Sequence, residues 1–391
     1  MKKAKKKIAF VLTTFVVGGV EKTFLDMLDC IDQNEYDITV FLPDNYGEWT
    51  ALLQKKCRVK YLKIEGFKTV FCGQIVQLQL FAAFRSLFFR ILSRLNYKNN
   101  YRKSTEYFIR SMPRVKERFD CVVAYQIIND ECMLGSLYRL KAPVKVVWSH
   151  AYINKQEAIY GQWYNKFDKL FCVSRFAKKA LIDNFPFLAD KTEVFYNVIN
   201  PKEILRLADE SMDLQFSNAY ISIVTVGRLT SDKGQDIIPH TARLLVDAGY
   251  PIKWYLVGDG DLRETLVNSI SENKVQDTVI LLGNKNNPYP YMKKCDIYVQ
   301  TSVLEGWGLT VSEAKILHKP IVSTDAGALA EQIENGVNGI LVEKQNPEKL
   351  ASGIKQLIEN PELREFFFRQ LQREDVCHTG ELRKLYQLME R

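Results

Sequence analysis

The sequence predicts an α/β protein with two domains, each built around a parallel sheet. Short runs of β-branched and aromatic residues recur along the 391 residues and alternate with helical patterns. The alternation lapses once, near residues 197–218, and then resumes. Because strand–helix alternation produces parallel sheets covered by helices on both faces, two such series predict two doubly wound domains.

The first series contains six short runs rich in β-branched and aromatic residues, which predict strands buried in a parallel sheet. They are Ile8–Val17, Ile38–Leu42, Val59–Ile64, Cys121–Tyr125, Val144–Trp148 and Leu170–Val173. After the first run, apolar residues recur at helical spacing, which predicts an amphipathic helix. These residues are Val20, Phe24, Leu28 and Ile31.

The second series contains six further runs of the same kind. They are Ile221–Val226, Ile252–Val257, Val279–Leu282, Ile297–Gln300, Ile321–Ser323 and Gly339–Val342. Beyond Pro361 the pattern is helical, with no further strand. We therefore expect an N-terminal domain over 1–200, a C-terminal domain over 201–368, and a helical segment over 369–391 that packs back on the N-terminal domain.

Composition and charge exclude several classes of protein. Apolar residues make up 47% and charged residues 26%, which excludes a disordered or collagen-like chain. The net charge of +8 is uneven, since residues 1–200 hold 32 Lys/Arg against 19 Asp/Glu. Residues 51–118 alone hold 16 basic and 3 acidic side chains. This local excess predicts an anionic partner.

The cysteines and the N-terminus both indicate the cytoplasm. Eight cysteines occur without a C-x-x-C pair, so we expect free thiols and no Cys/His metal site. A lysine-rich start followed by uncharged residues resembles a signal peptide, but the run passes through Gly18-Gly19 into a helical pattern without a cleavage site. The longest other uncharged run, Thr69–Phe84, has 16 residues, whereas a spanning helix needs about 20.

Ligands of open α/β sheets bind at the carboxyl ends of the strands, so the residues that follow each strand are candidates for a site. Gly18 and Gly19 allow close approach to the backbone at a helix N-terminus, although a plain tight turn is the simpler interpretation. His150 follows a strand and is equally consistent with a structural role. Arg228 and Lys233 lie in one turn and suit a diphosphate, with a solvated surface loop as the alternative.

The densest signal is the segment from Glu305 to Glu313, which follows a strand and leads into a helix. Its small residues can turn backbone N–H groups toward an anion, and its two carboxylates can accept hydrogen bonds from sugar hydroxyls. By contrast, Asp259-Gly260-Asp261 has the form of a metal-chelating D-x-D motif. It lies at an ordinary strand-to-helix turn, so a turn with a helix N-cap is the better interpretation.

Together these motifs resemble those of retaining glycosyltransferases of family 4, which have the GT-B fold. The resemblance is carried by Gly18-Gly19, Gly227-Arg228 with Lys233, Gly258-Asp259-Gly260, Glu305 through Glu313, and Asp325-Ala326-Gly327. It implies two doubly wound Rossmann-like domains facing across a cleft. It also implies transfer of a sugar, with retention, from a UDP- or GDP-sugar to a glycan or lipid-linked acceptor in cell-surface polysaccharide or glycolipid synthesis. The nucleotide sugar is a substrate, and no cofactor or metal is expected.

The resemblance assigns roles to single residues. Arg228 and Lys233 would bind the donor diphosphate, and Glu313 would hold the ribose. His150 would reach the transferred sugar, and Glu305 would bind the donor sugar and phosphates. These donor contacts are completed by the residues Gly18, Gly19, Gly306, Trp307, Gly308 and Leu309. The implied catalytic set is His150, Arg228, Lys233 and Glu305. The sequence departs from the family pattern at Lys22, Trp307 and Thr310, and the last of these leaves the sugar specificity open.

Two other functions stay open. A sugar-nucleotide epimerase on the same architecture would need acid/base carboxylates in the first domain, where the sequence offers no clear candidate. A non-catalytic nucleotide-sugar-binding partner of another transferase is disfavoured because Arg228, Lys233 and Glu305 are all present. Nucleic-acid binding is not expected, since no base-reading module accompanies the basic residues.

Residues 78–98 predict a helix with a basic edge beside a broad apolar stripe. When the segment is plotted with helical periodicity, the cations of the basic edge gather along one side, and they are Arg85, Arg90, Arg94 and Lys98. The apolar residues occupy the adjoining side, and they are Leu80, Phe81, Phe84, Phe88, Ile91 and Leu95. This layout is typical of a helix lying on an anionic membrane surface, although a core-facing helix fits the pattern equally well. We expect a peripheral protein on the inner face of the cell membrane.

Overall fold

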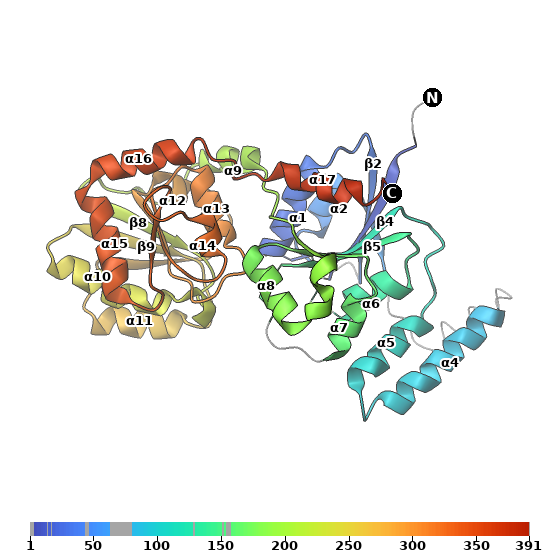
Figure 1. The fold of residues 1–391 in the computed structure, drawn as a ribbon. Coiled ribbons are helices and arrows are strands. Elements are labelled where there is room, and N and C mark those ends of the chain that lie inside the picture. Colours follow the sequence, from blue (N-terminus) through green and yellow to red (C-terminus); the bar gives the residue numbers. More distant parts are fainter. Residues whose placement is uncertain are drawn as a thin grey trace. The chain divides into compact units, whose positions relative to one another are not determined.

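The computed structural model describes residues 4–13, 15–16, 18–43, 47–62, 80–127, 130–150, 152–153 and 158–390. The chain forms two compact units (Figure 1). Unit 1 contains Met1–Ile199 and His378–Arg391, and unit 2 contains Asn200–Cys377. The chain leaves unit 1 after Ile199, close to the expected boundary at residue 200. It returns to unit 1 at His378, whereas the C-terminal segment was expected to begin at residue 369.

Unit 1 is built on a seven-stranded sheet in the order β3-β2-β1-β4-β5-β6-β7, and neighbouring strands run parallel. The strands are β1 (Lys6–Val11), β2 (Tyr36–Leu42), β3 (Arg58–Tyr61), β4 (Cys121–Ala124), β5 (Val144–Ser149), β6 (Lys169–Cys172) and β7 (Thr192–Val194). The apolar residues of β1, β4 and β6 are almost fully buried, which explains why these predicted runs carry so little alternation.

The helices of unit 1 lie around this sheet, except that the pair over residues 80–96 and 101–111 extends away from it (Figure 1). They are α1 (Gly19–Cys30), α2 (Thr50–Lys56), α4 (Leu80–Asn96), α5 (Tyr101–Ser111), α6 (Asp130–Tyr138), α7 (Ala158–Tyr164), α8 (Arg175–Asn184), the 3-10 helices Pro186–Lys191 and Thr379–Glu381, and α17 (Leu382–Gln387). Helix α17 packs against the start of β2, where the rings of Tyr386 and Tyr36 stack with their centroids 4.2 Å apart. Lys384 also donates to the carbonyl of Val194 at 2.7 Å.

Unit 2 is built on a six-stranded parallel sheet in the order β10-β9-β8-β11-β12-β13. The strands are β8 (Ile221–Val226), β9 (Ile252–Val257), β10 (Val279–Gly283), β11 (Ile297–Gln300), β12 (Ile321–Thr324) and β13 (Ile340–Val342). The helices are α9 (Pro201–Ala208), α10 (Ile238–Asp247), α11 (Arg263–Glu272), α12 (Tyr289–Lys294), α13 (Leu309–Ile316), α14 (Leu329–Gln332), α15 (Pro347–Glu359), α16 (Pro361–Leu371), and two 3-10 turns at Ser231–Lys233 and Gln235–Ile237.

The predicted strands are confirmed, although several of their ends differ from the predicted ones. The first strand ends at Val11, whereas the predicted run continued to Val17. Parts of three predicted segments lie outside the described residues. They are residues 14 and 17 of the first run, residues 63–64 of the third run, and residues 69–79 of the long uncharged run. β7 was not predicted, because three residues carry too little pattern. Helix α9 occupies the joint between the two series.

Both sheets have the same strand order, and this places a ligand site in each unit. The order reverses between the first and fourth strands, that is between β1 and β4 in unit 1 and between β8 and β11 in unit 2. Connections leave such a point in opposite directions, so the loops at its carboxyl edge part and leave room for a ligand.

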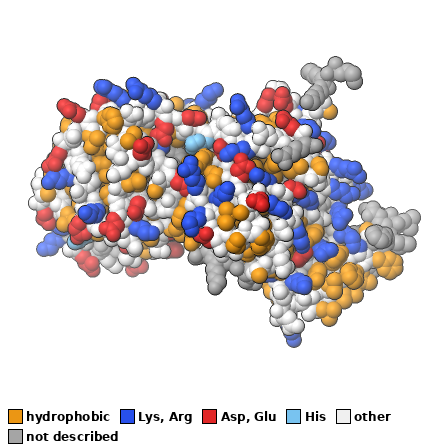
Figure 2. Space-filling view, viewed as in Figure 1, with side chains coloured by type: hydrophobic (Ala, Val, Ile, Leu, Met, Phe, Trp, Pro, Cys, Tyr) orange, Lys and Arg blue, Asp and Glu red, His pale blue; other side chains and the backbone are white. Residues whose placement is uncertain are grey.

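Helix α4 has the reverse of the usual orientation. Its small residues Ala83, Ser86 and Ser93 are buried, and Ser93 Oγ lies 3.0 Å from Ser104 Oγ of α5. The large apolar residues face outward instead, and their exposed fractions are Phe84 71%, Leu95 68%, Phe88 57% and Ile91 50%. Figure 2 shows them as an orange area at the lower right, where Figure 1 places α4. The expected core-facing alternative is therefore wrong for this stripe.

The basic edge of α4 also differs from the expectation. Arg85 donates to the backbone carbonyls of Arg110 and Met112, the latter at 2.9 Å. Arg90 lies 4.0 Å above the ring of Phe108, and burial lowers the pKa of both guanidinium groups. Both arginines thus hold α4 on α5 rather than pointing to solvent with the stripe. Arg94 is exposed, and Lys98 is exposed but lies beyond the helix end.

Candidate active site

In unit 2, the loops after β8 and β11 are joined at the switch point of the sheet. Gly234 has φ 62°, and a Cβ there would lie 2.3 Å from the carbonyl oxygen of Thr301. Thr301 Oγ1 donates to the carbonyl of Lys233 at 2.9 Å, and the amide of Val303 donates to the carbonyl of Asp232 at 2.9 Å. Only glycine permits this approach, so the two loops form one surface.

An ion pair connects the two loops at the side-chain level. Lys233 Nζ donates to Glu305 Oε1, which also accepts a hydrogen bond from Ser302 Oγ at 3.0 Å. Glu305 is only 8% exposed, and Lys233 is half-buried. The structure thus brings together two residues that are 72 positions apart and that the family resemblance had assigned to one site.

A buried polar network supports Glu305 from below. Gln300 Nε2 donates to Ser302 Oγ at 2.8 Å, and Gln300 Oε1 accepts from Tyr298 at 2.8 Å and from Thr310 at 3.0 Å. Because the members of the network satisfy one another, it holds the Glu305 carboxylate in one position. Gln300 and Ser302 were not among the predicted site residues, although polar residues at the end of an apolar strand were a usable signal.

The glycine loop before α13 packs against residues of α14. Gly308 has φ 89°, and a Cβ there would lie 2.4 Å from Leu329 Cδ2. Gln332 donates to the carbonyls of Trp307 and Gly308, and it accepts from Ser312 Oγ at 2.7 Å. The ring nitrogen of Trp307 donates to Ser312 at 3.1 Å. The buried Trp307 side chain therefore supports the loop.

The remaining candidates of unit 2 lie in α13 and in the two joined loops. Glu313 is buried in the first turns of α13 and accepts a hydrogen bond from the Tyr289 hydroxyl at 3.0 Å. Arg228 is exposed, and the loop that carries it is fixed because Gln235 donates to the Arg228 carbonyl at 2.8 Å. The backbone of Gly306 and Leu309 lies in the same loop between Glu305 and Glu313.

The segment Gly258-Asp259-Gly260 supports the Arg228 loop. A Cβ on Gly258 would lie 1.9 Å from the Gly227 oxygen, and the Leu229 amide donates to the Asp259 carbonyl at 3.0 Å. The predicted turn is present, but the predicted N-cap is wrong, because α11 is preceded by Leu262 and has no side-chain cap. Within the described residues, no group of three or more His, Cys, Asp and Glu side chains could hold a metal ion.

In unit 1, the two glycines lie at the start of α1. Gly18 is the residue before the helix, with an extended backbone, and Gly19 is its first residue. A Cβ on Gly18 would lie 2.5 Å from Glu21 Oε2, so the Glu21 carboxylate folds back over the helix start. Burial raises the pKa of Glu21. This carboxylate is another feature that the sequence analysis did not identify as part of the site.

His150 follows β5 and lies among aromatic rings. Its ring centroid is 4.3 Å from that of Tyr125 and 5.9 Å from that of Trp148. Burial lowers the pKa of His150 to about 3, and its Nε2 atom is buried without a hydrogen-bond partner among the described residues. The imidazole is therefore neutral near pH 7 and suits a hydrogen bond to a hydroxyl better than a phosphate contact.

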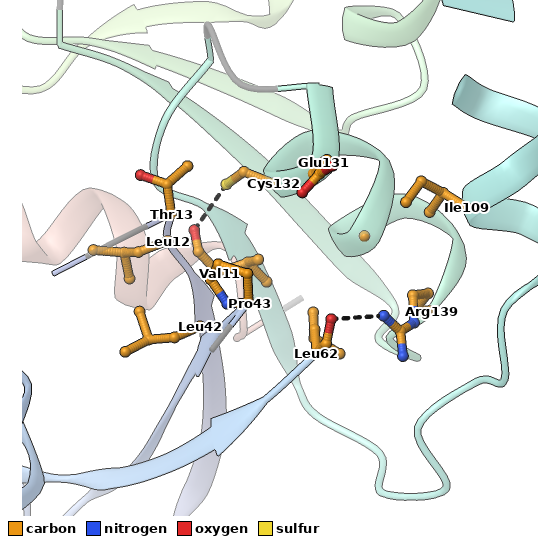
Figure 3. Close-up of a pocket in the computed structure, with 11 residues that line it drawn as sticks. Val11, Leu12, Thr13, Leu42, Pro43, Leu62, Ile109, Glu131, Cys132 and Arg139 are labelled. Carbon is orange, nitrogen blue, oxygen red and sulfur yellow. Dashed lines mark hydrogen bonds between the residues drawn. The ribbon is translucent and has the colours of Figure 1, made fainter. Parts of the chain in front are cut away.

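Unit 1 also contains a cavity of about 210 Å³ at the carboxyl ends of β1, β2 and β3 (Figure 3). Its walls are mostly apolar, and its charged groups are Glu131 of α6 and Arg139, which follows the end of that helix. Burial, with a smaller contribution from Asp130, raises the pKa of Glu131. Arg139 donates to the Leu62 carbonyl at 3.0 Å, and Cys132 Sγ to the Val11 carbonyl at 2.9 Å. Sequence reasoning missed this cavity because its lining comes from many separate elements.

Comparison with known proteins identifies relatives in one family. The family described as glycosyl transferases group 1 matches residues 210–370. An uncharacterized glycosyltransferase of Methanocaldococcus jannaschii is 30% identical over 259 residues, which is 63% of this chain and 68% of that protein. The N-acetylgalactosamine-N,N'-diacetylbacillosaminyl-diphospho-undecaprenol 4-alpha-N-acetylgalactosaminyltransferase of Campylobacter jejuni is 32% identical over 208 residues, 52% of this chain and 54% of its own length. The chain thus spans about half the length of this second relative.

Solved structures share the whole architecture. HepE of Anabaena, solved in complex with UDP, has a TM-score of 0.70 at 19% identity and covers 97% of this chain and 99% of its own. A glycosyltransferase from Rickettsia africae has a TM-score of 0.72 at 18% identity and covers 99% of both chains. Together with the two parallel sheets described above, these matches confirm the predicted α/β fold of GT-B type.

Proposed function

The chain belongs to the group 1 glycosyl transferases, and we propose that it moves a sugar from a UDP- or GDP-sugar to a hydroxyl of a glycan or lipid-linked acceptor. The observation that supports this most directly is the joined pair of loops in unit 2, in which Glu305 holds Lys233 and the same loop carries the exposed Arg228. A sugar nucleotide presents a diphosphate between two polyols, which matches cations placed beside buried carboxylates.

We propose that the chemistry of unit 2 is stabilisation of the departing diphosphate. Arg228 and Lys233 supply positive charge, and the N-terminus of α13 adds its partial positive charge at the glycine loop. The Glu305 carboxylate keeps Lys233 in position, and Glu313, steadied by Tyr289, accepts hydrogen bonds from the ribose hydroxyls. Since protein cations neutralise the leaving group, we expect turnover without an added metal.

We propose that the product retains the donor's anomeric configuration. A retaining glycosidase uses a carboxylate nucleophile, but Glu305 is paired with Lys233 and Ser302 and is therefore a poor candidate for attack. In the proposed step, the acceptor hydroxyl attacks on the face that the diphosphate leaves, and a phosphate oxygen takes up its proton. The neutral His150 hydrogen-bonds a hydroxyl of the transferred sugar.

We propose that unit 1 binds a lipid-linked acceptor and associates with the inner face of the cell membrane. Its apolar cavity at the carboxyl edge of the sheet offers a place for the acceptor, and the exposed stripe of α4 offers an apolar contact with lipid. The Campylobacter jejuni relative is itself named for a diphospho-undecaprenol-linked acceptor. Among the described residues, no helix combines the length and apolarity needed to cross a bilayer.

The test is transfer by the purified protein, followed by NMR of the product. UDP- and GDP-sugars are offered with an undecaprenyl-diphosphate-linked sugar, in the presence and absence of EDTA. We expect a product with the donor's anomeric configuration and turnover that survives EDTA. An inverted product would refute retention, and a complete loss with EDTA that is restored by Mn²⁺ would refute the assignment of charge neutralisation to Arg228 and Lys233.

A further inference from the structure

Unit 1 has a second concave region at the opposite edge of its sheet. A pocket of about 630 Å³ is formed by the segments that precede β4 and β5, and its basic lining residues are Arg114, Arg118, Lys141 and Lys145. The volume falls in the range of about 300–1,000 Å³ that is common for small-molecule sites. Gly18, Gly19 and His150 follow strands, whereas these four residues precede strands or begin one. The pocket is thus separate from the candidate active site.

Three of the cations in this basic pocket are free to bind an anion. Arg114, Arg118 and Lys141 are exposed, and none of them forms an ion pair or side-chain hydrogen bond with a described residue. No Asp or Glu is among the described residues that line the pocket. A concave surface with several cations and no carboxylate concentrates positive potential, which favours a phosphate group.

The fourth cation, Lys145, forms the floor of the basic pocket. Its Nζ donates to the carbonyls of Ser136 and Leu140, at 2.9 and 3.0 Å, and to that of Leu137. Its hydrogen bonds are therefore used at the end of α6, and it contributes charge rather than a free donor. Burial, and next Arg114, lower its pKa to about 8.

The acidic residues near the basic pocket are already engaged. Asp168 faces Lys145, and its carboxylate accepts a hydrogen bond from the Lys145 backbone amide at 2.7 Å. Glu117 is paired with Lys60 at 2.5 Å and with Lys7 at 3.4 Å. Glu106 accepts hydrogen bonds from Tyr138, Trp163 and Lys166. The carboxylates of this region thus leave the three free cations uncompensated.

The basic pocket is continuous with the segment that anchors α4. Arg85 of α4 donates to the Met112 carbonyl, two residues before Arg114. Burial is the main cause that lowers the pKa of Arg85, and the positive charges of Arg114 and Arg110 lower it further. The three guanidinium groups therefore lie near one another. Figure 2 shows Lys and Arg side chains along the same flank of unit 1 as the apolar side chains of α4.

We propose that the basic pocket binds the phosphate of an anionic phospholipid head group while the exposed stripe of α4 lies in the adjoining lipid. An apolar stripe and a cationic pocket on one flank fit a membrane surface, because the two features match its apolar interior and its anionic head groups. The proposal deepens the proposed membrane association and adds a specific phosphate site. It does not depend on sugar transfer.

The test measures binding of the purified full chain to vesicles by sedimentation. One preparation is phosphatidylcholine with phosphatidylglycerol, and the second has the same surface charge from oleate, which carries a carboxylate and no phosphate. The variant Arg114→Ala/Arg118→Ala/Lys141→Ala removes the free cations. The control Lys202→Ala/Lys349→Ala/Arg383→Ala removes three cations that are exposed elsewhere on the described surface. Circular dichroism verifies that each variant is folded.

We expect the wild type to bind phosphatidylglycerol vesicles more tightly than oleate vesicles. Each cation near an anionic leaflet contributes about fivefold, so the pocket variant should lose about a hundredfold in partitioning, whereas the control retains most of it. The proposal is overturned if the pocket variant binds as the control does, or if the wild type does not distinguish phosphate from carboxylate vesicles. If glycerol phosphate in solution stabilises the wild type and vesicles do not bind, the phosphate comes from a soluble ligand and the lipid assignment is wrong.

Discussion

The carboxyl edges of the two sheets differ although both sheets have the same strand order. In unit 2, the loops after β8 and β11 are joined by the close contact of Gly234 with the Thr301 carbonyl and by side-chain hydrogen bonds. These contacts hold Lys233 and Glu305 together. In unit 1, the corresponding edge contains an apolar cavity of about 210 Å³ with few polar groups. The difference indicates that one edge is built for a fixed, highly charged ligand and the other for a ligand with substantial apolar surface.

The largest effect is expected at the ion pair that closes the unit 2 edge. Lys233→Ala and Arg228→Ala should each lower kcat by about 10²–10³, because a preorganised charge that stabilises a leaving group contributes about 2.7–4 kcal/mol to transition-state stability. Steady-state kinetics with a UDP- or GDP-sugar measures the loss. Lys349→Ala, at an exposed position on α15, is the control and should keep normal turnover.

Near-normal turnover in both the Arg228 and Lys233 variants, with the fold verified by circular dichroism, would remove the basis for the polar edge as the donor site. Glu305→Gln sharpens the same comparison. It keeps an acceptor for Ser302 but removes the negative charge that holds Lys233. We expect a smaller loss of kcat than in Lys233→Ala, since the ammonium group is still present.

The second prediction tests whether the glycine loop of unit 2 is preformed. Gly308→Ala should lower the free energy of unfolding by about 1–3 kcal/mol, because a side chain at φ 89° is strained and its Cβ would lie 2.4 Å from Leu329. Gly336→Ala is a matched control, since Gly336 has φ 78° with open space around the added Cβ. The difference in urea-unfolding free energy between the two variants measures the cost of the contact between the added Cβ and Leu329. Equal values would show that the loop can move aside.

The third prediction concerns the apolar edge of unit 1. Gly135 lines the cavity, and a Cβ there would lie 3.6 Å from Leu62 Cδ1, which is ordinary contact. Gly135→Leu should fill the cavity and raise the acceptor KM about tenfold, while the donor KM stays the same. Gly135→Ala is the control and should leave both values nearly unchanged. A donor KM that rises with the larger side chain would assign the cavity to the donor.

The smallest expected effect is the pH dependence caused by His150. Its pKa is about 3 in the folded chain against an ordinary 6.5, so below pH 6.5 the unfolded chain takes up a proton that the folded chain does not. The stability should therefore fall as the pH drops from about 6.5 toward 3, by at most about 1.4 kcal/mol per pH unit, and this contribution is absent above pH 6.5.

His150→Gln should flatten the pH dependence of the unfolding free energy in that window. His240→Gln is the control, because His240 is half-exposed and pairs with Glu348 at the surface. If the His150 and His240 variants have the same slope as the wild type, His150 is protonated normally and can act as a cation. That result would weaken the contrast between a highly charged unit 2 edge and a mainly apolar unit 1 edge.

The sequence alone determined most of the fold and the list of candidate residues. Strands such as β8, β9 and β11 were predicted with their observed ends, because buried parallel strands are apolar over their whole length and stop where polar or glycine residues begin. Since parallel sheets bind ligands at one edge, Arg228, Lys233 and Glu305 were candidates without coordinates, and the resemblance to family 4 glycosyltransferases assigned them to one site.

Only the tertiary structure decided which of these residues touch and which way each helix faces. The Lys233–Glu305 pair and its support from Gln300 depend on contacts between different loops, and a local pattern carries no information about such contacts. On α4 the apolar stripe was visible in the sequence, but its outward direction was not. Ser93 and Ala83 allow close packing on α5, so the small face was buried and the large apolar face was left exposed. A helical period fixes the angles between side chains, and only packing against neighbours fixes the rotation of the helix.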